Sequence, residues 1–204
     1  KVSGVQIEYF LSYFDFNKVT TGKEYLLDQR MPYWEKHVPA WSKIYKKSFL
    51  LVNDIFFPET VFYEDNLQTL KSLLVCTRFK YIPDFIYFYR INPDSTVNSD
   101  DLIGRKIGDR LIACYQCIET LELTPLLKNE KSSLIETYVY IFEKSKKKIF
   151  YLPYTEKRNF WAEAKTINYD FLKKYLTHKT LFYYQHFRLF MVISVFAMPF
   201  IRFI

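Results

Sequence analysis

The chain contains very little glycine. Only 4 of its 204 residues are Gly, which is about 2% where roughly 7% is usual. Phosphate-binding loops of the P-loop and dinucleotide-binding types need several glycines at fixed spacings, because the backbone must turn tightly against the phosphate. The shortage of glycine therefore excludes both kinds of loop.

Cysteine and histidine are also scarce. The three cysteines, Cys76, Cys114 and Cys117, are too few for a disulfide framework, and no signal peptide is recognisable at Lys1, so we expect a reducing, cytoplasmic setting. The pair Cys114 and Cys117 has C-x-x-C spacing but no second pair of ligands, which favours core thiols over a metal or redox site. An initiating Met is lacking, which suggests a piece of a longer protein.

Aromatic residues and positive charge are abundant. The chain has 18 Tyr, 20 Phe and 3 Trp, and half of its residues are hydrophobic, which excludes a disordered protein. Lys and Arg exceed Asp and Glu by 29 to 22, a net charge of +7. This excess favours an anionic partner such as a membrane surface or a phosphate-bearing substrate. Nucleic acid is not expected, because the basic residues are dispersed and no recognition motif accompanies them.

The first hundred residues predict a mixed α/β domain. Apolar spacing and breakers indicate three helices, at 23–31, within 41–53 with Ser42 as a candidate cap, and at 65–76. Short aromatic and β-branched runs predict a buried strand at 55–57 and two strands within 79–91 that meet at Pro83. A loop is expected at 92–99.

The rest of the chain predicts helices only. Apolar residues recur at helical spacing from 99 to 121, and similar patterns cover 130–150 and 156–176. The apolar run from Leu189 to Ile201 has 13 residues, too few for a bilayer that needs about 20. Its basic flanks favour a helix lying in the headgroup region; a helix buried in the core or in a dimer contact is the alternative. We therefore expect three parts: 1–98, a helical extension over 99–180, and a membrane-associating segment over 181–204.

Two adjacent carboxylates stand out among the residues that could carry chemistry. Glu64 and Asp65 occupy the expected start of the 65–76 helix, where the helix dipole stabilises their ionised forms. Consecutive helical side chains point about 100° apart, so the two cannot share a proton. One of them can act as a base or an anchor. The alternative is that both simply complement the helix dipole.

Three blocks of sequence resemble family 2 glycosyltransferases of bacterial surface-polysaccharide synthesis. The blocks are P-A-W-S-K-I-Y-K-K-S-F-L at 39–50, I-F-F-P-E-T-V-F-Y-E-D-N at 55–66, and Y-I-P-D-F-I-Y-F-Y-R at 81–90 followed by Ser95 and Thr96. They occur in the order of that family and near its spacing, and they correspond to the C-terminal half of its catalytic domain. The resemblance implies a GT-A fold, a nucleotide-diphospho-sugar donor and transfer with inversion.

The resemblance also implies roles for particular residues. Asp65 would be the general base and Glu64 would help to place the acceptor or the base. Donor and diphosphate binding would fall to Arg90, Ser95, Thr96 and Lys43, and acceptor binding to Trp41 and Tyr63, with Tyr87 and Tyr89 as further cleft residues. Each also has an ordinary structural interpretation: a strand-end charge for the arginine, packing for the tryptophan and lysine, and half-buried sheet positions for the tyrosines.

The chain departs from that family in one respect. Family members hold a divalent metal, Mg or Mn, through a D-x-D motif in their N-terminal half, and no such motif occurs here. We therefore expect the acceptor-side part of an α/β transferase, with metal ligands outside this chain, acting on a glycan or lipid-linked acceptor at the inner face of the cell membrane, with a homo-oligomer as one option. The alternative is a non-catalytic module that docks on a membrane or a partner protein.

Overall fold

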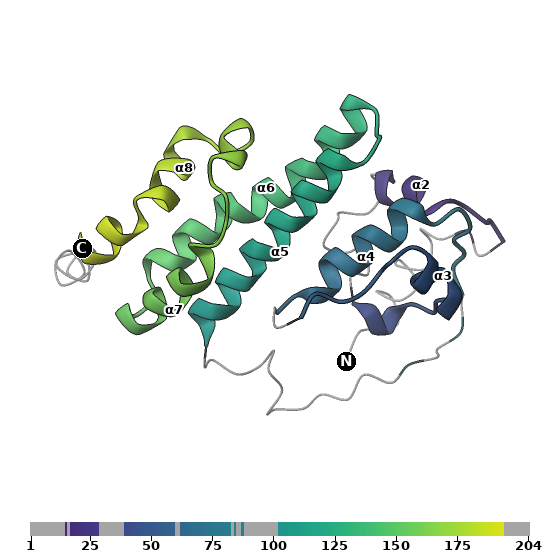
Figure 1. Cartoon of the computed structure of the whole chain (residues 1–204), viewed down its shortest axis with the longest axis horizontal. Coiled ribbons are helices and arrows are strands. Elements are labelled where there is room, and N and C mark those ends of the chain that lie inside the picture. Colours follow the sequence, from purple (N-terminus) through teal and green to yellow (C-terminus); the bar gives the residue numbers. More distant parts are fainter. Residues whose placement is uncertain are drawn as a thin grey trace, which may run out of the picture. The chain divides into compact units, whose positions relative to one another are not determined.

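The structure is a computed structural model that describes residues 15, 17–28, 39–59, 62–82, 84, 87 and 102–193. The chain divides into two units. Unit 1 comprises Lys1–Pro58 and Asp65–Arg90, and unit 2 comprises Glu59–Glu64 and Ile91–Ile204. Figure 1 labels the helices of both units.

The described part of unit 1 is helical. Its elements are α2 (Gly22–Leu27), the short 3-10 helix η2 (Ala40–Ser42), α3 (Lys47–Val52) and α4 (Glu64–Val75). The first residue of α4, Glu64, is assigned to unit 2 and the remainder of the helix to unit 1. Helix α4 confirms the helix expected at 65–76, and it buries Leu67, Leu70 and Leu73, the i, i+3, i+6 spacing of one helical face. Ser42 lies inside η2 and does not cap α3, which begins after Lys46 without a side-chain cap.

Helix α2 packs closely on the end of α4. Thr21 caps α2: its hydroxyl accepts a hydrogen bond from the Glu24 N–H at 3.1 Å, and Glu24 accepts one from the Thr21 N–H at 2.7 Å. A Cβ atom on Gly22 would lie 2.2 Å from the carbonyl oxygen of Leu73. Because only glycine has no Cβ, this contact explains why one of the few glycines stands here.

The α/β fold class predicted from the sequence is wrong. The described residues contain no strand and no α/β core; their β-type pairing is a single isolated bridge between Thr20 and Phe79. Residues 55–57 form no strand, and the Ile55 N–H donates to the Leu50 carbonyl of the preceding helix at 3.0 Å. Ile55 is buried, whereas Phe56 and Phe57 are about half exposed. A short run of apolar residues has the composition of a strand even where no second segment pairs with it. Composition alone was therefore not enough to predict a strand here. Most of 83–91, where two more strands were predicted, lies outside the described residues.

Unit 2 contains a set of packed helices. They are α5 (Ile103–Leu123), α6 (Lys128–Phe150), α7 (Tyr154–Ala164), the 3-10 helix η3 (Phe171–Lys174) and α8 (His178–Gln185). Helix α5 packs against both α6 and α7, and α8 contacts α6 (Figure 1). The core combines leucines and isoleucines with large aromatic residues, and among its fully buried side chains are those of Tyr138, Phe142, Phe160, Tyr184 and Phe187. The helices predicted at 99–121 and 130–150 are confirmed over their described residues.

Two glycines allow α5 and α7 to approach each other. A Cβ on Gly104 would lie 1.8 Å from the carbonyl oxygen of Glu156, and one on Gly108 would lie 2.8 Å from the Cβ of Glu163. The Gly104 N–H also donates a hydrogen bond to the Glu156 carboxylate at 2.7 Å. The two glycines are four residues apart and therefore share one face of α5. Together with Gly22, they place three of the chain's four glycines at close contacts.

The helix predicted at 156–176 is wrong beyond Ala164, where α7 ends. Local side-chain hydrogen bonds replace the helical ones in the segment that follows. The Thr166 hydroxyl donates to the Glu163 carbonyl at 2.8 Å, and the Asn168 side-chain oxygen accepts from the Phe171 N–H at 3.1 Å. Short polar side chains of this kind compete with helical hydrogen bonds and stabilise turns. The chain therefore reverses direction here and returns as α8.

Helix α8 is tied to α6 by hydrogen bonds. The Thr177 hydroxyl caps α8 by accepting from the Thr180 N–H at 3.3 Å, and it donates to the Glu143 carboxylate at 3.0 Å. The Tyr184 hydroxyl donates to the Phe142 carbonyl at 2.8 Å. Helical residues 187–193 follow. Within the part of the chain that the structure describes, no helix is both long enough and apolar enough to span a membrane.

Candidate functional site

Two aromatic rings form a partly exposed surface in unit 1. Trp41 lies in η2, and its ring stacks on that of Tyr87 with the centroids 4.9 Å apart and the planes at 18°. The two side chains stay 47% and 50% exposed, respectively, so the stacked pair is held in place while much of its area remains open to solvent. A flat aromatic face of this kind can pack against the apolar face of a sugar ring.

Lys43 lies immediately after η2 and is partly buried. Its ammonium donates hydrogen bonds to the Pro39 carbonyl and to the Ser42 hydroxyl, both at 3.1 Å. Burial lowers the pKa of Lys43 to about 8, and the negative charge of Asp65 partly opposes that shift. Lys43 and Asp65 therefore lie close enough to attract each other, although 22 positions separate them in the sequence.

Asp65 lies in the first turn of α4, as the sequence predicted. Its Oδ1 accepts a hydrogen bond from the Asn66 side-chain amide at 3.2 Å. The partial positive charge of a helix N-terminus and the ammonium of Lys43 both favour a carboxylate in its ionised form. Glu64 precedes it and is also partly exposed; its side chain leaves the helix about 100° away from that of Asp65. The site thus offers an ionised carboxylate, an ammonium group and an aromatic face.

The two residues before Glu64 are held by α5, within unit 2. The Phe62 N–H donates to the Asp109 carboxylate at 3.2 Å, and the Arg105 guanidinium lies over the Phe62 ring, 5.4 Å from its centroid. Arg105 also pairs with Asp109 at 3.7 Å. Tyr63 adopts a left-handed backbone with φ of 68°, which is unusual for a residue with a side chain. These contacts fix the turn from which α4 starts.

Sequence reasoning missed Asp109. Its side chain is buried, and burial raises its pKa, with the Phe62 N–H and Arg105 opposing the shift. The only signal in the sequence is a single acidic residue between Gly108 and Arg110 in an amphipathic helical pattern. That signal does not say which backbone group the carboxylate binds.

Several residues with predicted roles lie elsewhere. Arg90, Ser95, Thr96 and Tyr89 lie outside the described residues. Tyr63 is 39% exposed and belongs to unit 2, where the Arg110 guanidinium lies 5.6 Å from its ring centroid. In unit 1 the structure brings together Trp41 with Tyr87, and Lys43 with Asp65.

The described residues do not fit a metal site. No group of three or more His, Cys, Asp or Glu side chains in the described part of the chain could hold a metal ion. Cys114 and Cys117 are free thiols buried in α5, and burial raises the pKa of Cys114 well above its usual range, so they are core residues.

Comparison of the chain with protein-family models, with curated proteins and with solved structures found no match.

Proposed function

We propose that Trp41, Lys43 and Asp65 form the acceptor side of an inverting glycosyltransferase. The enzyme transfers a sugar from a nucleotide-diphospho-sugar to a glycan or lipid-linked acceptor in surface-polysaccharide synthesis. The observation that carries the proposal is the stacked, half-exposed ring of Trp41 two residues before Lys43. The ammonium of Lys43 is held by the Pro39 carbonyl and the Ser42 hydroxyl, and it interacts electrostatically with Asp65. The resemblance of blocks 39–50, 55–66 and 81–90 to family 2 glycosyltransferases supports the same assignment.

Asp65 acts as the general base in this proposal. Its carboxylate takes the proton from an acceptor hydroxyl while the hydroxyl oxygen forms a bond to the anomeric carbon. The bond from that carbon to the diphosphate breaks on the opposite face, and the leaving nucleoside diphosphate keeps the electron pair. Attack and departure on opposite faces invert the anomeric centre. Glu64, which points in another direction, positions the acceptor.

Lys43 and Trp41 prepare the acceptor for attack. The Lys43 ammonium interacts with the Asp65 carboxylate and offers a positive charge to an acceptor or a phosphate oxygen. The Trp41 ring supports the acceptor sugar from one side. Because Tyr87 stacks on the indole, little side-chain entropy remains to be lost when the sugar binds.

The donor side relies on residues outside the described ones. Arg90, Ser95 and Thr96 would close over the diphosphate through a guanidinium fork and hydroxyl hydrogen bonds. A divalent Mg or Mn ion, held by residues beyond this chain, would neutralise the diphosphate charge.

An apolar stripe on α8 and the following turns supports attachment to the inner face of the cell membrane. Leu189 and Ile193 are four residues apart in the helical residues 187–193 and share one face of that segment. Phe182 lies on α8 before it, and all three side chains are about half exposed. Exposed Lys179 and Arg188 flank the stripe, which suits anionic headgroups. This stripe also favours the second candidate, a non-catalytic docking module, because such a module needs only the membrane contact.

A donor screen with the full-length protein separates the two candidates. The protein is incubated with a panel of nucleotide-diphospho-sugars, polysaccharide or lipid-linked acceptors and Mg or Mn, and nucleoside diphosphate release is measured. We expect acceptor-dependent release with at least one donor. If no donor is turned over while the protein still binds anionic vesicles, the docking module is the correct function.

A further inference from the structure

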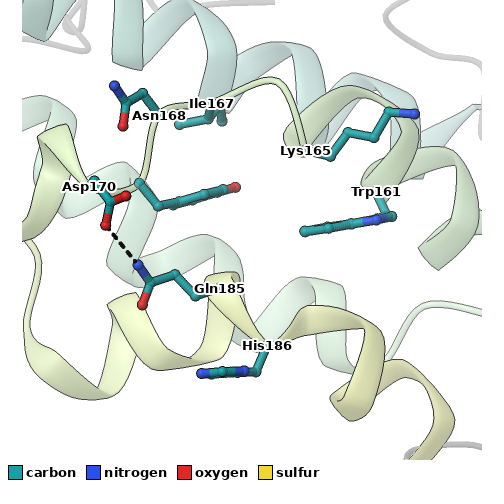
Figure 2. A pocket seen from close by; sticks show the side chains of 8 residues that line it. Trp161, Lys165, Ile167, Asn168, Asp170, Gln185 and His186 are labelled. Atoms are coloured by element: carbon teal, nitrogen blue, oxygen red, sulfur yellow. Dashed lines mark hydrogen bonds between the residues drawn. The ribbon is translucent and has the colours of Figure 1, made fainter.

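A groove of about 380 Å³ lies within unit 2, where the break after α7 faces the end of α8 (Figure 2). Trp161 and Lys165 come from α7 and its end, and Asn168 and Asp170 come from the segment after it. Gln185 and His186 come from the end of α8. The volume falls within the range of small-molecule sites, about 300–1,000 Å³.

The floor of the groove is aromatic and firmly held. Tyr169 is buried, stacks on Tyr184 with centroids 5.6 Å apart, and donates its hydroxyl hydrogen to the Ala164 carbonyl at 3.0 Å. Trp161 is partly exposed and stacks on Phe187, also at 5.6 Å. A floor fixed by such contacts exists before any ligand arrives and needs no reordering to bind one.

The rim carries exposed polar side chains that include two amides, a carboxylate, an ammonium and an imidazole. Figure 2 shows Asn168, Asp170 and Gln185 across the groove from Trp161 and Lys165. The Asn168 oxygen is used by the Phe171 N–H, so its amide N–H groups are left to donate. Asp170 pairs with Lys173 at 2.7 Å and accepts from Gln185 at 3.5 Å, which holds its carboxylate and the amide side by side.

This combination of floor and rim selects against most ligand classes. The rim carries one ammonium, Lys165, and one carboxylate, Asp170, which already pairs with Lys173, so its charges are of both signs and favour neither an anion nor a cation. A wholly apolar ligand would remove water from the rim amides without replacing its hydrogen bonds, which is unfavourable. A neutral ring with one apolar face and several hydroxyls satisfies both parts of the groove, because hydroxyls both donate and accept.

We propose that this groove is a saccharide-binding site. The sugar ring lies on Trp161, and its hydroxyls bond to the side chains of Asn168, Gln185 and His186. The site contains no residue of the transfer reaction proposed above, which is assigned to unit 1, so it binds a saccharide without changing it. Since Gln185 and His186 end the helix that also carries Phe182, a saccharide attached to a membrane lipid suits the position.

The test is a binding measurement with the full chain. The protein is applied to an array of immobilised oligosaccharides built from hexoses and N-acetylhexosamines, and the best soluble oligosaccharide is then titrated by calorimetry. We expect Asn168→Ala and His186→Ala each to raise the dissociation constant about tenfold, the loss of roughly one hydrogen bond. Trp161→Ala should abolish binding and Trp161→Phe should retain most of it.

Matched controls exist on the same unit. Asn129 and His178 are exposed and lie outside the groove, so Asn129→Ala and His178→Ala should leave the affinity within about twofold. Asn168 and His186 are exposed too, and these variants test the site even if Trp161→Ala fails to fold. Trp41→Ala should leave groove binding unchanged, so loss of the proposed transferase activity and loss of this site are separate results.

Three outcomes would overturn the proposal. The first is that the protein binds no saccharide on the array. The second is that Asn168→Ala and His186→Ala bind as tightly as the unaltered protein. The third is that inorganic phosphate at the same concentration displaces the oligosaccharide, which would make the groove an anion site.

Discussion

The Asp109 carboxylate accepts a hydrogen bond from the Phe62 N–H at 3.2 Å, across 47 positions of sequence. The acceptor is buried and the donor precedes Glu64 and Asp65 by two and three residues. A helix in the second half of the chain thus holds the turn that leads into the candidate catalytic residues. Within unit 2, α5 therefore fixes the residues that immediately precede Glu64.

Replacing Asp109 should weaken this support in a graded way. Asp109→Ala leaves the Phe62 N–H without its acceptor and should lower the free energy of unfolding by about 1–3 kcal/mol. Asp109→Asn keeps an acceptor oxygen and should lower it less. Urea denaturation measures both, with Asp170→Ala, an exposed aspartate of the same unit, as a control that should change stability by less than about 0.5 kcal/mol. Equal effects for all three variants would contradict the assignment.

The raised pKa of Asp109 also gives a pH dependence. Burial makes the folded protein hold this proton more tightly than the unfolded chain does. Stability contributed by the protonated carboxyl should therefore fall as pH rises from about 4, the ordinary value for Asp, through the raised value. The amide of Asp109→Asn has no carboxyl proton to lose, so the stability of this variant should fall less over the same range. Parallel pH profiles for the two proteins would contradict the prediction.

Gly104 should not tolerate even a methyl group. The Cβ of Gly104→Ala would lie 1.8 Å from a backbone oxygen of α7, so α5 and α7 must separate. We expect a loss of about 3 kcal/mol in the free energy of unfolding. The Cβ of Gly108→Ala would lie 2.8 Å from the Glu163 Cβ and 3.1 Å from the Phe160 carbonyl oxygen, a less severe overlap, so this variant should lose less. Because helix propensity alone would make either change stabilising by about 1 kcal/mol, a stabilised Gly104→Ala variant would show that the helices are not in close contact there.

Lys43 should give transfer activity a basic limb. Its pKa of about 8 means that its charge is lost as pH rises through that value, so kcat/KM should fall there. Lys43→Arg stays charged at any working pH and should extend activity to higher pH, whereas Lys43→Gln should be poorly active throughout. If the activity of Lys43→Arg falls at the same pH as that of the unaltered protein, another group is responsible for the decrease.

The same pKa predicts how stability changes with pH. In the unfolded chain Lys43 titrates near 10.5, so between about pH 8 and 10.5 the unfolded state binds more protons than the folded state. Stability should therefore rise with pH across this window as the buried charge is removed. Lys43→Arg should lack that rise. Denaturation at several pH values measures this without a substrate.

Membrane attachment should depend on the α8 stripe. Phe182→Ser, Leu189→Ser and Ile193→Ser should each weaken binding to phosphatidylglycerol vesicles by roughly tenfold, from about 1.5 kcal/mol per inserted side chain. Added salt should weaken binding further. Leu123 and Leu127 are more exposed than any of the three, but they lie at the end of α5 and just before α6, outside the stripe. Their Ser variants should therefore bind normally. Equal losses at both places would point to non-specific adhesion.

The sequence predicted the longer helices well because their signal is local. Leu67, Leu70 and Leu73 share one face of α4 wherever the rest of the chain lies, and the same holds for the apolar spacing of α5 and α6. The strand at 55–57 was wrong because pairing depends on a distant partner that composition does not reveal. The end of α7 was missed because Thr166 and Asn168 act through hydrogen bonds to particular backbone groups.

The candidate site was predictable only in part. The resemblance of the three sequence blocks points to Trp41, Lys43 and Asp65, and in the structure Lys43 interacts electrostatically with Asp65. The stacking of Trp41 on Tyr87 and the acceptor role of Asp109 are contacts between distant segments. Nothing in the local pattern specifies such contacts, so the groove beside Trp161 and the support of the α4 start emerged only from the fold.

The most direct measurement is the transfer rate of Asp65→Asn in the full-length enzyme, with donor binding measured in parallel. The amide keeps the shape of the side chain but cannot accept the acceptor's proton, so transfer should fall by at least about a hundredfold while donor affinity stays unchanged. Asp54→Asn, an exposed aspartate of the same unit, should keep full activity. Near-normal turnover by Asp65→Asn would remove Asp65 from the reaction and contradict the proposed function.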